Sequence, residues 1–76
     1  MYELEIETKN KLKKIKNPKK ARIKDIIFFD ILQVMDCDGK WHVVCKCCVG
    51  VTTAQIILND INDAIKKRQS SVYVDI

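Results

Sequence analysis

The segment "DIIFFDILQVMDCDGKWHVVCKCCVGV", residues 25–51, decides the fold of this chain. Two apolar runs, rich in β-branched and aromatic residues, flank Asp38 and Gly39. Asp-Gly between two such runs is a strong hairpin signal, because both positions of a two-residue turn need positive φ. The segment therefore predicts a hairpin of two long antiparallel strands.

The register of this hairpin follows if Asp38 and Gly39 are the two turn residues. The opposed pairs are then Cys37 with Lys40, Val34 with Val43, Leu32 with Cys45, and Asp30 with Cys47. The core face carries Ile26, Phe28, Leu32, Val34, Trp41, Val43, Cys45, Cys47 and Val49. The opposite face carries Ile27, Phe29, Ile31, Met35 and Val44. That face is too apolar to remain in water, so we expect it to be a homodimer or partner face unless the chain folds over it.

Other elements follow from periodicity on both sides of the hairpin. Residues 2–7 alternate apolar and acidic side chains, which predicts a first strand with one buried face. Residues 52–68 predict a helix with Thr52 or Thr53 as N-cap. Its apolar stripe consists of Ala54, Ile57, Leu58, Ile61, Ala64 and Ile65. Residues 72–76 alternate again and predict a last strand.

These elements predict one α+β domain spanning residues 1–76, with about four strands in the order β-β-β-α-β. We expect an antiparallel-rich sheet with one amphipathic helix packed on one face. A chain of 76 residues forms only a thin core, which oligomerisation often supplements.

The charge is concentrated in residues 9–24, which contain nine basic residues and no acidic one. They are Lys9, Lys11, Lys13, Lys14, Lys16, Lys19, Lys20, Arg22 and Lys24. Because the whole chain carries +4, the remaining residues carry +4 less +9, or −5. Few apolar residues and the turn-forming "NPKK" at residues 17–20 favour a basic loop between the first two strands.

Two functions suit this basic loop. Lysines uninterrupted by acids can follow a phosphate backbone of DNA or RNA, and a single arginine predicts weak sequence specificity. The alternative is a protein-binding module, such as an inhibitor or adaptor that phages direct against a host nucleic-acid-processing complex. Such a module would dock through the basic loop and the apolar hairpin face. A solvated loop without a ligand is the competing interpretation.

The four cysteines do not have the spacing of a metal site. In the predicted hairpin, Cys45 lies about 16 Å along the ladder from Cys37, and Cys48 points away from Cys45 and Cys47. We expect thiols that pack as small apolar side chains, with no metal and no cofactor. His42 has no acid or thiol near it by spacing, so we expect a solvated side chain.

The sequence contains no signature of catalysis. With only Gly39 and Gly50, it has no glycine-rich phosphate loop, and Asp30 and Asp36 would lie about 20 Å apart. We therefore expect a binding protein and no enzyme. The alternating N-terminus does not resemble a signal peptide, and no apolar run is long enough for a membrane span. A cytoplasmic location follows as an expectation.

Overall fold

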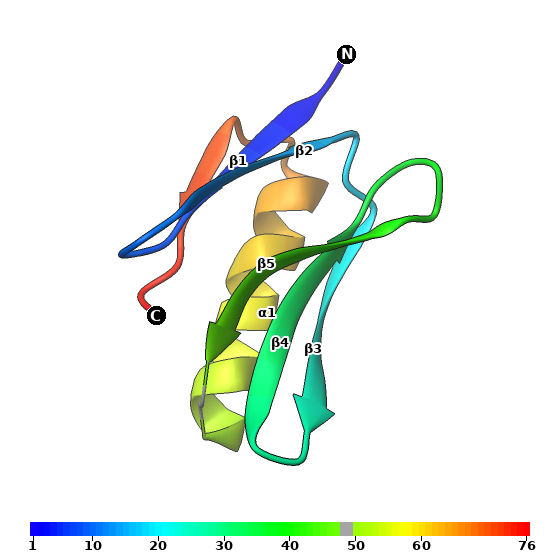
Figure 1. The fold of residues 1–76 in the computed structure, drawn as a ribbon. Helices are drawn as coiled ribbons and strands as arrows, with labels where there is room; N and C mark the ends of the chain where they lie inside the picture. The colour runs from blue at the N-terminus through cyan, green and yellow to red at the C-terminus, as the bar shows by residue number, and fades with distance from the viewer. Residues whose placement is uncertain (48–49) are drawn as a thin grey trace.

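The computed structural model describes residues 1–47 and 50–76 and confirms the α+β class. The elements are β1 (Glu3–Glu7), β2 (Leu12–Lys16), β3 (Lys20–Ile26), β4 (Phe29–Met35), β5 (Trp41–Cys47), α1 (Val51–Lys66) and β6 (Ser71–Tyr73). The described residues thus form six strands in place of the four predicted. Figure 1 shows α1 behind the long β4 and β5, with the β1 sheet near the C-terminal end of the helix.

The strands form two three-stranded sheets, in the orders β2-β1-β6 and β3-β4-β5. β1 pairs antiparallel with β2 and parallel with β6, whereas β3, β4 and β5 pair antiparallel throughout. The core lies between the inner faces of both sheets and α1. Its buried apolar residues are Leu4, Ile6, Ile15, Leu32, Val34, Val44, Cys45, Ile57, Ile61, Ala64 and Val74.

The predicted basic loop at residues 9–24 is wrong, because most of this segment forms β2 and the first part of β3. Ile15 is buried opposite Leu4 of β1, and this contact anchors β2 in the first sheet. The connection to β3 passes through Asn17, at φ 45°, and the buried Pro18. One inward apolar residue in β2 is enough for a strand when its neighbours point to solvent, but it is too few to produce a periodic signal.

The predicted single strand over residues 25–37 is also two strands joined by a tight turn. β3 ends at Ile26, Ile27 and Phe28 form the turn, and β4 begins at Phe29. Ile27 is 91% exposed and Phe28 84% exposed, so the expected core position of Phe28 is wrong. A turn made of two large apolar residues has none of the Gly, Pro, Asn or Asp signals that mark turns in sequences.

The β4–β5 hairpin exists as predicted, but its register near the turn differs by one residue. The Asp36 N–H donates to the Lys40 carbonyl at 2.9 Å, so the loop has three residues, with Gly39 at φ 82°. Val34 therefore lies opposite His42 and not Val43.

The register shifts between Leu32 and Gln33, where Val44 is the extra residue of β5. Beyond the shift, the predicted pairs Leu32 with Cys45 and Asp30 with Cys47 are confirmed. The shift exchanges the faces predicted for two valines. Val44 lies in the core, 2% exposed, and Val43 lies on the outer face, 43% exposed. The expectation that Val44 belongs to an exposed partner face is therefore wrong.

The predicted apolar stripe of the helix is confirmed, whereas the predicted N-cap is not. Ile57, Ile61 and Ala64 are buried, and the other members of the stripe are partly buried. The helix begins one residue before the expected caps: Gly50 is the N-cap, with no side-chain hydrogen bond.

The C-terminus of α1 ends in a Schellman motif. The Gln69 N–H donates to Ala64 O at 2.9 Å, and the Arg68 N–H donates to Ile65 O at 3.1 Å. Arg68 takes the left-handed position at φ 53°, which glycine usually occupies. Its guanidinium lies 4.8 Å from the centre of the Tyr2 ring, and the Tyr2 hydroxyl donates to Gln69 O at 2.6 Å. Burial raises the pKa of Tyr2, although the Arg68 charge opposes this shift.

Replacing Ile61 by alanine should lower the free energy of unfolding by about 2 to 5 kcal/mol, because the fully buried side chain leaves a cavity between α1 and the sheets. Urea unfolding measures this loss. The matched control is Ile56→Ala on the exposed side of the same helix, which should cost less than about 1 kcal/mol. Equal losses in the two variants would contradict the orientation of α1.

Replacing Arg68 by glycine should give a more stable protein than replacing it by alanine, by about 1 kcal/mol. Both variants lose the contact with Tyr2, and only glycine relieves the left-handed conformation. Thermal unfolding of the two variants under identical conditions measures the difference. An alanine variant as stable as the glycine variant would mean that residue 68 is not held at positive φ.

Candidate functional site

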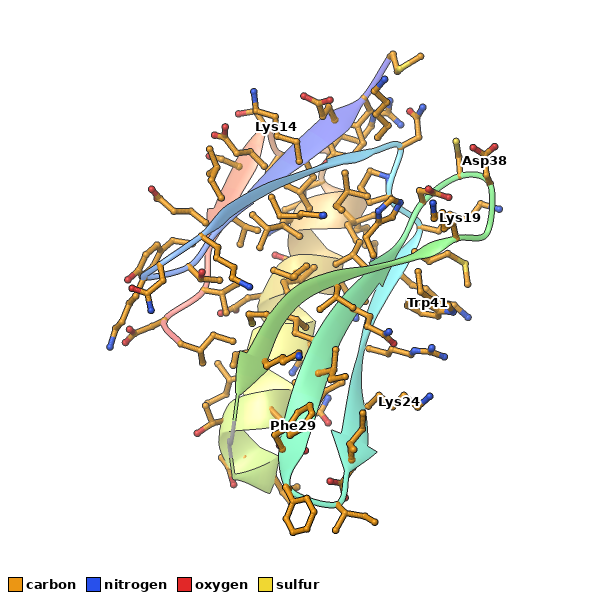
Figure 2. All side chains as sticks on the ribbon, in the orientation of Figure 1. Lys14, Lys19, Lys24, Phe29, Asp38 and Trp41 are labelled. Atoms are coloured by element: carbon orange, nitrogen blue, oxygen red, sulfur yellow. The ribbon has the colours of Figure 1, made fainter. Side chains whose placement is uncertain are left out.

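The outer face of the β3-β4-β5 sheet gathers basic and aromatic side chains. Lys20, Arg22 and Lys24 of β3 are exposed and alternate with the half-buried Ala21 and Ile23. Since successive side chains of a strand point to opposite faces, the three cations share the side away from the core. Figure 2 shows Lys24 and Trp41 projecting from this sheet on the side away from α1.

Register places further residues of β4 and β5 beside these cations. Lys20 lies opposite Met35, Arg22 opposite Gln33, and Lys24 opposite Ile31. Across β4, Met35 lies opposite Trp41, Gln33 opposite Val43, and Ile31 opposite Lys46. We call this surface the basic sheet face. Its members are Lys20, Arg22, Lys24, Ile26, Phe29, Ile31, Gln33, Met35, Trp41, Val43 and Lys46.

Arg22 and Trp41 are in contact near the end of the basic sheet face where β5 begins. The Arg22 guanidinium carbon lies 3.8 Å from the centre of the Trp41 ring, and its Nε donates to Gln33 Oε1 at 2.8 Å. The Lys20 ammonium lies 5.9 Å from the same ring. At the far end of the face, the Lys46 ammonium lies 5.5 Å from the Phe29 ring. Each of these cation–π contacts contributes about 0.5 to 1 kcal/mol at an exposed site, so the cations are held over the rings.

The charge of this face is not balanced by acids on the same side. Lys20, Arg22, Lys24 and Lys46 supply four positive charges, and no carboxylate shares the face among the residues that the structure describes. Asp25 and Asp30 lie opposite each other on the inner side, where they line a cavity with the first turns of α1. The face therefore presents a local positive potential to an anionic ligand.

Two of the three lysines of β2 lie opposite glutamates. Lys16 lies opposite Glu3, and Lys14 opposite Glu5, on the outer side of the β2-β1-β6 sheet. Opposite charges in direct cross-strand positions attract each other, so these two lysines stabilise the sheet.

The other predicted basic residues of residues 9–19 are dispersed around β2. Lys13 is half-buried opposite Ile6, and Lys9 pairs with Asp75 at 3.3 Å. Lys11 belongs to the turn closed by Thr8, and the Lys19 backbone N–H donates to Met35 O at 2.8 Å. The structure thus separates the nine predicted cations: three lie on the basic sheet face, five lie on or next to β2, and Lys19 lies in the connection just before β3.

The predicted apolar partner face is divided in the same way. Phe29, Ile31 and Met35 are half-buried and lie on the basic sheet face, beside the cations. Ile27 lies at the tip of the β3–β4 turn, and Val44 is in the core. The two surfaces that sequence analysis treats as separate, one basic and one apolar, therefore meet on one sheet.

His42 and Asp36 form a pair that sequence analysis missed. His42 Nε2 lies 2.6 Å from Asp36 Oδ2, and Asp36 Oδ1 accepts the N–H groups of Asp38 at 2.8 Å and Lys40 at 3.0 Å. The hydrogen bond with His42, followed by those from the loop backbone, lowers the pKa of Asp36. A three-residue loop in the predicted hairpin would have revealed this pair, because it places Asp36 diagonally across from His42.

A cavity of about 370 Å³ lies beside this pair. It is lined by Met1, Lys14, Lys16, Asn17, Asp36, Cys37, Asp38 and His42. Asp36 and His42 are both committed to the hairpin loop through their hydrogen bond, so we assign them a structural role.

Replacing Asp36 by asparagine should destabilise the protein above about pH 4 and change its stability progressively less at lower pH. An unperturbed aspartate titrates near pH 3.9. The folded-state pKa of Asp36 is lower than this unfolded value. The stability that Asp36 contributes is therefore fully present above the unfolded pKa and is lost as pH falls through the folded pKa. Thermal melts from pH 2 to 5 test this. Asp38→Asn, with the same charge change in the same loop, is the control, and a wild-type minus variant difference independent of pH would contradict the role of Asp36.

The described residues were compared with the requirements of a metal site and of a membrane span. Within residues 1–47 and 50–76, no group of three or more His, Cys, Asp or Glu side chains could hold a metal ion. Cys37 is exposed and Cys45 is buried. The predictions for Cys48 and Val49 lie outside the described residues, as does the prediction for the side chain of Cys47. No helix in the described part of the chain is long and apolar enough to cross a membrane.

No protein-family model matches the chain, and comparisons with curated proteins and with solved structures found no match.

Proposed function

We propose that this protein is a non-enzymatic nucleic-acid-binding protein that contacts the phosphate backbone through the basic sheet face. The observation that carries this proposal is the Arg22–Trp41 contact, which lies among three further cations with no carboxylate on the same face of the described chain. A cation row beside an aromatic ring provides both charge and a stacking surface for nucleotides. The proposed contact with nucleic acid still involves the basic segment, but it is made by the cations of β3 and not by all of residues 9–24.

Sequence specificity should be low. Lysine supplies charge without the planar geometry that reads a base edge, and Arg22 is the one arginine on the face. Its guanidinium is already engaged with Trp41 and Gln33. Affinity therefore comes mainly from release of counterions, and it should fall steeply with salt concentration.

The test is fluorescence anisotropy of labelled oligonucleotides at several salt concentrations. For four phosphate contacts, the slope of log K against log salt should be roughly −3 to −4. The triple variant Lys20→Gln, Arg22→Gln, Lys24→Gln should weaken binding by at least about 10-fold and reduce the slope by roughly 2 to 3, because it removes three of the contacts.

The matched control is the triple variant Lys11→Gln, Lys14→Gln, Lys16→Gln. It also removes three positive charges, but from β2 and its adjoining turn. Since Lys14 and Lys16 lie opposite glutamates, this variant should bind nearly as well as the wild type. Equal losses in both triple variants would show that net charge alone drives binding, and would contradict the assignment to the basic sheet face.

A second candidate function rests on the β3–β4 turn. Ile27 and Phe28 are two large apolar side chains at its tip, and both are almost fully exposed. Such a tip favours a protein-binding module, such as an inhibitor or adaptor of a nucleic-acid-processing complex, with the cations steering it toward an acidic partner. A homodimer formed through Phe29, Ile31 and Met35 would compete with nucleic acid for the same face. Binding to protein that persists at high salt and is lost in Ile27→Ser favours this candidate.

A further inference from the structure

We infer that the ligand of the basic sheet face is single-stranded nucleic acid, with unpaired bases stacking at Trp41 and at Phe29. This inference rests on the proposed function and specifies its ligand. A duplex could satisfy the cations equally well. The aromatic and aliphatic residues of the face distinguish the two ligands.

The stacking platform is the pair formed by Arg22 and Trp41. The guanidinium carbon lies 3.8 Å from the ring centre, well within the range of a cation–π contact. The hydrogen bond to Gln33 restrains the orientation of the guanidinium on the ring. Unpaired bases stack readily on aromatic rings and on arginine planes. A base in a duplex is covered on both faces by its neighbours, so it could not use this platform.

The surface between the two aromatic positions is largely apolar, although Gln33 and Lys46 also belong to it. Ile31, Met35 and Val43 lie between or beside the cations in the register of the sheet. The sugar-phosphate surface of a duplex would remove water from these side chains without an apolar group to pack against them. Flat bases splayed over the sheet supply such a group, so the composition of the face matches exposed bases better than paired ones.

The cations form a row along one edge of this surface. Lys20, Arg22 and Lys24 recur at every second residue of β3, which spaces them about 7 Å apart along the strand. β3 is one edge strand of its sheet, and Trp41 lies on the other edge strand, β5. This arrangement suits a backbone that follows β3 while its bases extend over β4 toward β5.

The spacing of the rings sets the length of the ligand. Trp41 lies opposite Met35, and Phe29 is six residues before Met35 on the same strand. At the usual rise per strand residue, the two aromatic positions are about 20 Å apart. A stacked strand advances about 3.4 Å per nucleotide, so roughly six steps span this distance, and an extended strand needs fewer. An octanucleotide can reach both rings, whereas a dinucleotide cannot.

The experiment uses Trp41, the only tryptophan of the chain, as an intrinsic fluorescent probe. The protein is titrated with a single-stranded 16-mer and with the corresponding blunt duplex at the same salt concentration. We expect the single strand to change Trp41 emission and to bind at least about 10-fold more tightly than the duplex. A series of oligothymidylates of 2 to 12 nucleotides should gain affinity up to about 6 to 8 nucleotides and level off beyond that length.

Variants test the contribution of the ring itself, with anisotropy of a labelled single strand as the readout. Trp41→Ala should weaken binding about 5- to 100-fold, the effect of losing one stacked base, and Trp41→Phe should retain most of the affinity. Tyr73→Ala is the matched control, because Tyr73 is an exposed aromatic on the outer side of the other sheet. It should bind as the wild type does. Phe29→Ala tests the second stacking position independently of Trp41.

The outcomes separate this inference from the proposed function. Salt-dependent binding that is equal for single strand and duplex, with unchanged Trp41 emission, would overturn the single-strand inference and leave nucleic-acid binding in place. No binding of either ligand at low salt would overturn both. The comparison of ligands and the length series use the wild-type protein, so the inference remains testable if Trp41→Ala does not fold.

Discussion

The hydrogen bonds of one carboxylate, Asp36, set the geometry on which the rest of the structure depends. The carboxylate accepts hydrogen bonds from the N–H groups of Asp38 and Lys40, which close a three-residue loop. Its other oxygen pairs with His42 on the next strand, β5. A loop longer by one residue than the expected turn moves every residue at the start of β5 to the other face. Trp41 consequently points outward, where it meets Arg22, and the extra residue Val44 later returns β5 to the core register.

The same alternation explains how a strongly basic segment becomes part of a folded sheet. In β2, Ile15 provides the buried contact, while Lys14 and Lys16 lie opposite glutamates of β1. In β3, the inward positions hold Ala21 and Ile23, and the cations point outward, with no acidic partner on the part of that face that the structure describes. The basic residues of one segment therefore have two uses, since those of β2 stabilise a sheet and those of β3 create a charged surface.

Part of the candidate site could be read from the chain and part could not. The cations of β3 and the apolar residues Phe29, Ile31 and Met35 stand out as unusual in the sequence, because charge and hydrophobicity need no partner to be recognised. Their placement on one face depends on pairing between β3 and β4, which begins after a turn made of Ile27 and Phe28. Such a turn carries no sequence signal. The Arg22–Trp41 contact joins the two edge strands of the sheet across β4, so local sequence patterns cannot predict it.

The sequence by itself determined the α+β class, the first strand, the apolar stripe of the helix, the presence of the β4–β5 hairpin and the excess of positive charge in residues 9–24. Each of these depends on composition or on a local period, which neighbouring residues report directly. Only the tertiary structure decided the register of β5, the assignment of basic residues to two sheets, and the outward position of Trp41. A period of two is the same before and after a one-residue shift, so the face that each side chain occupies is settled by loop hydrogen bonds and by packing between strands.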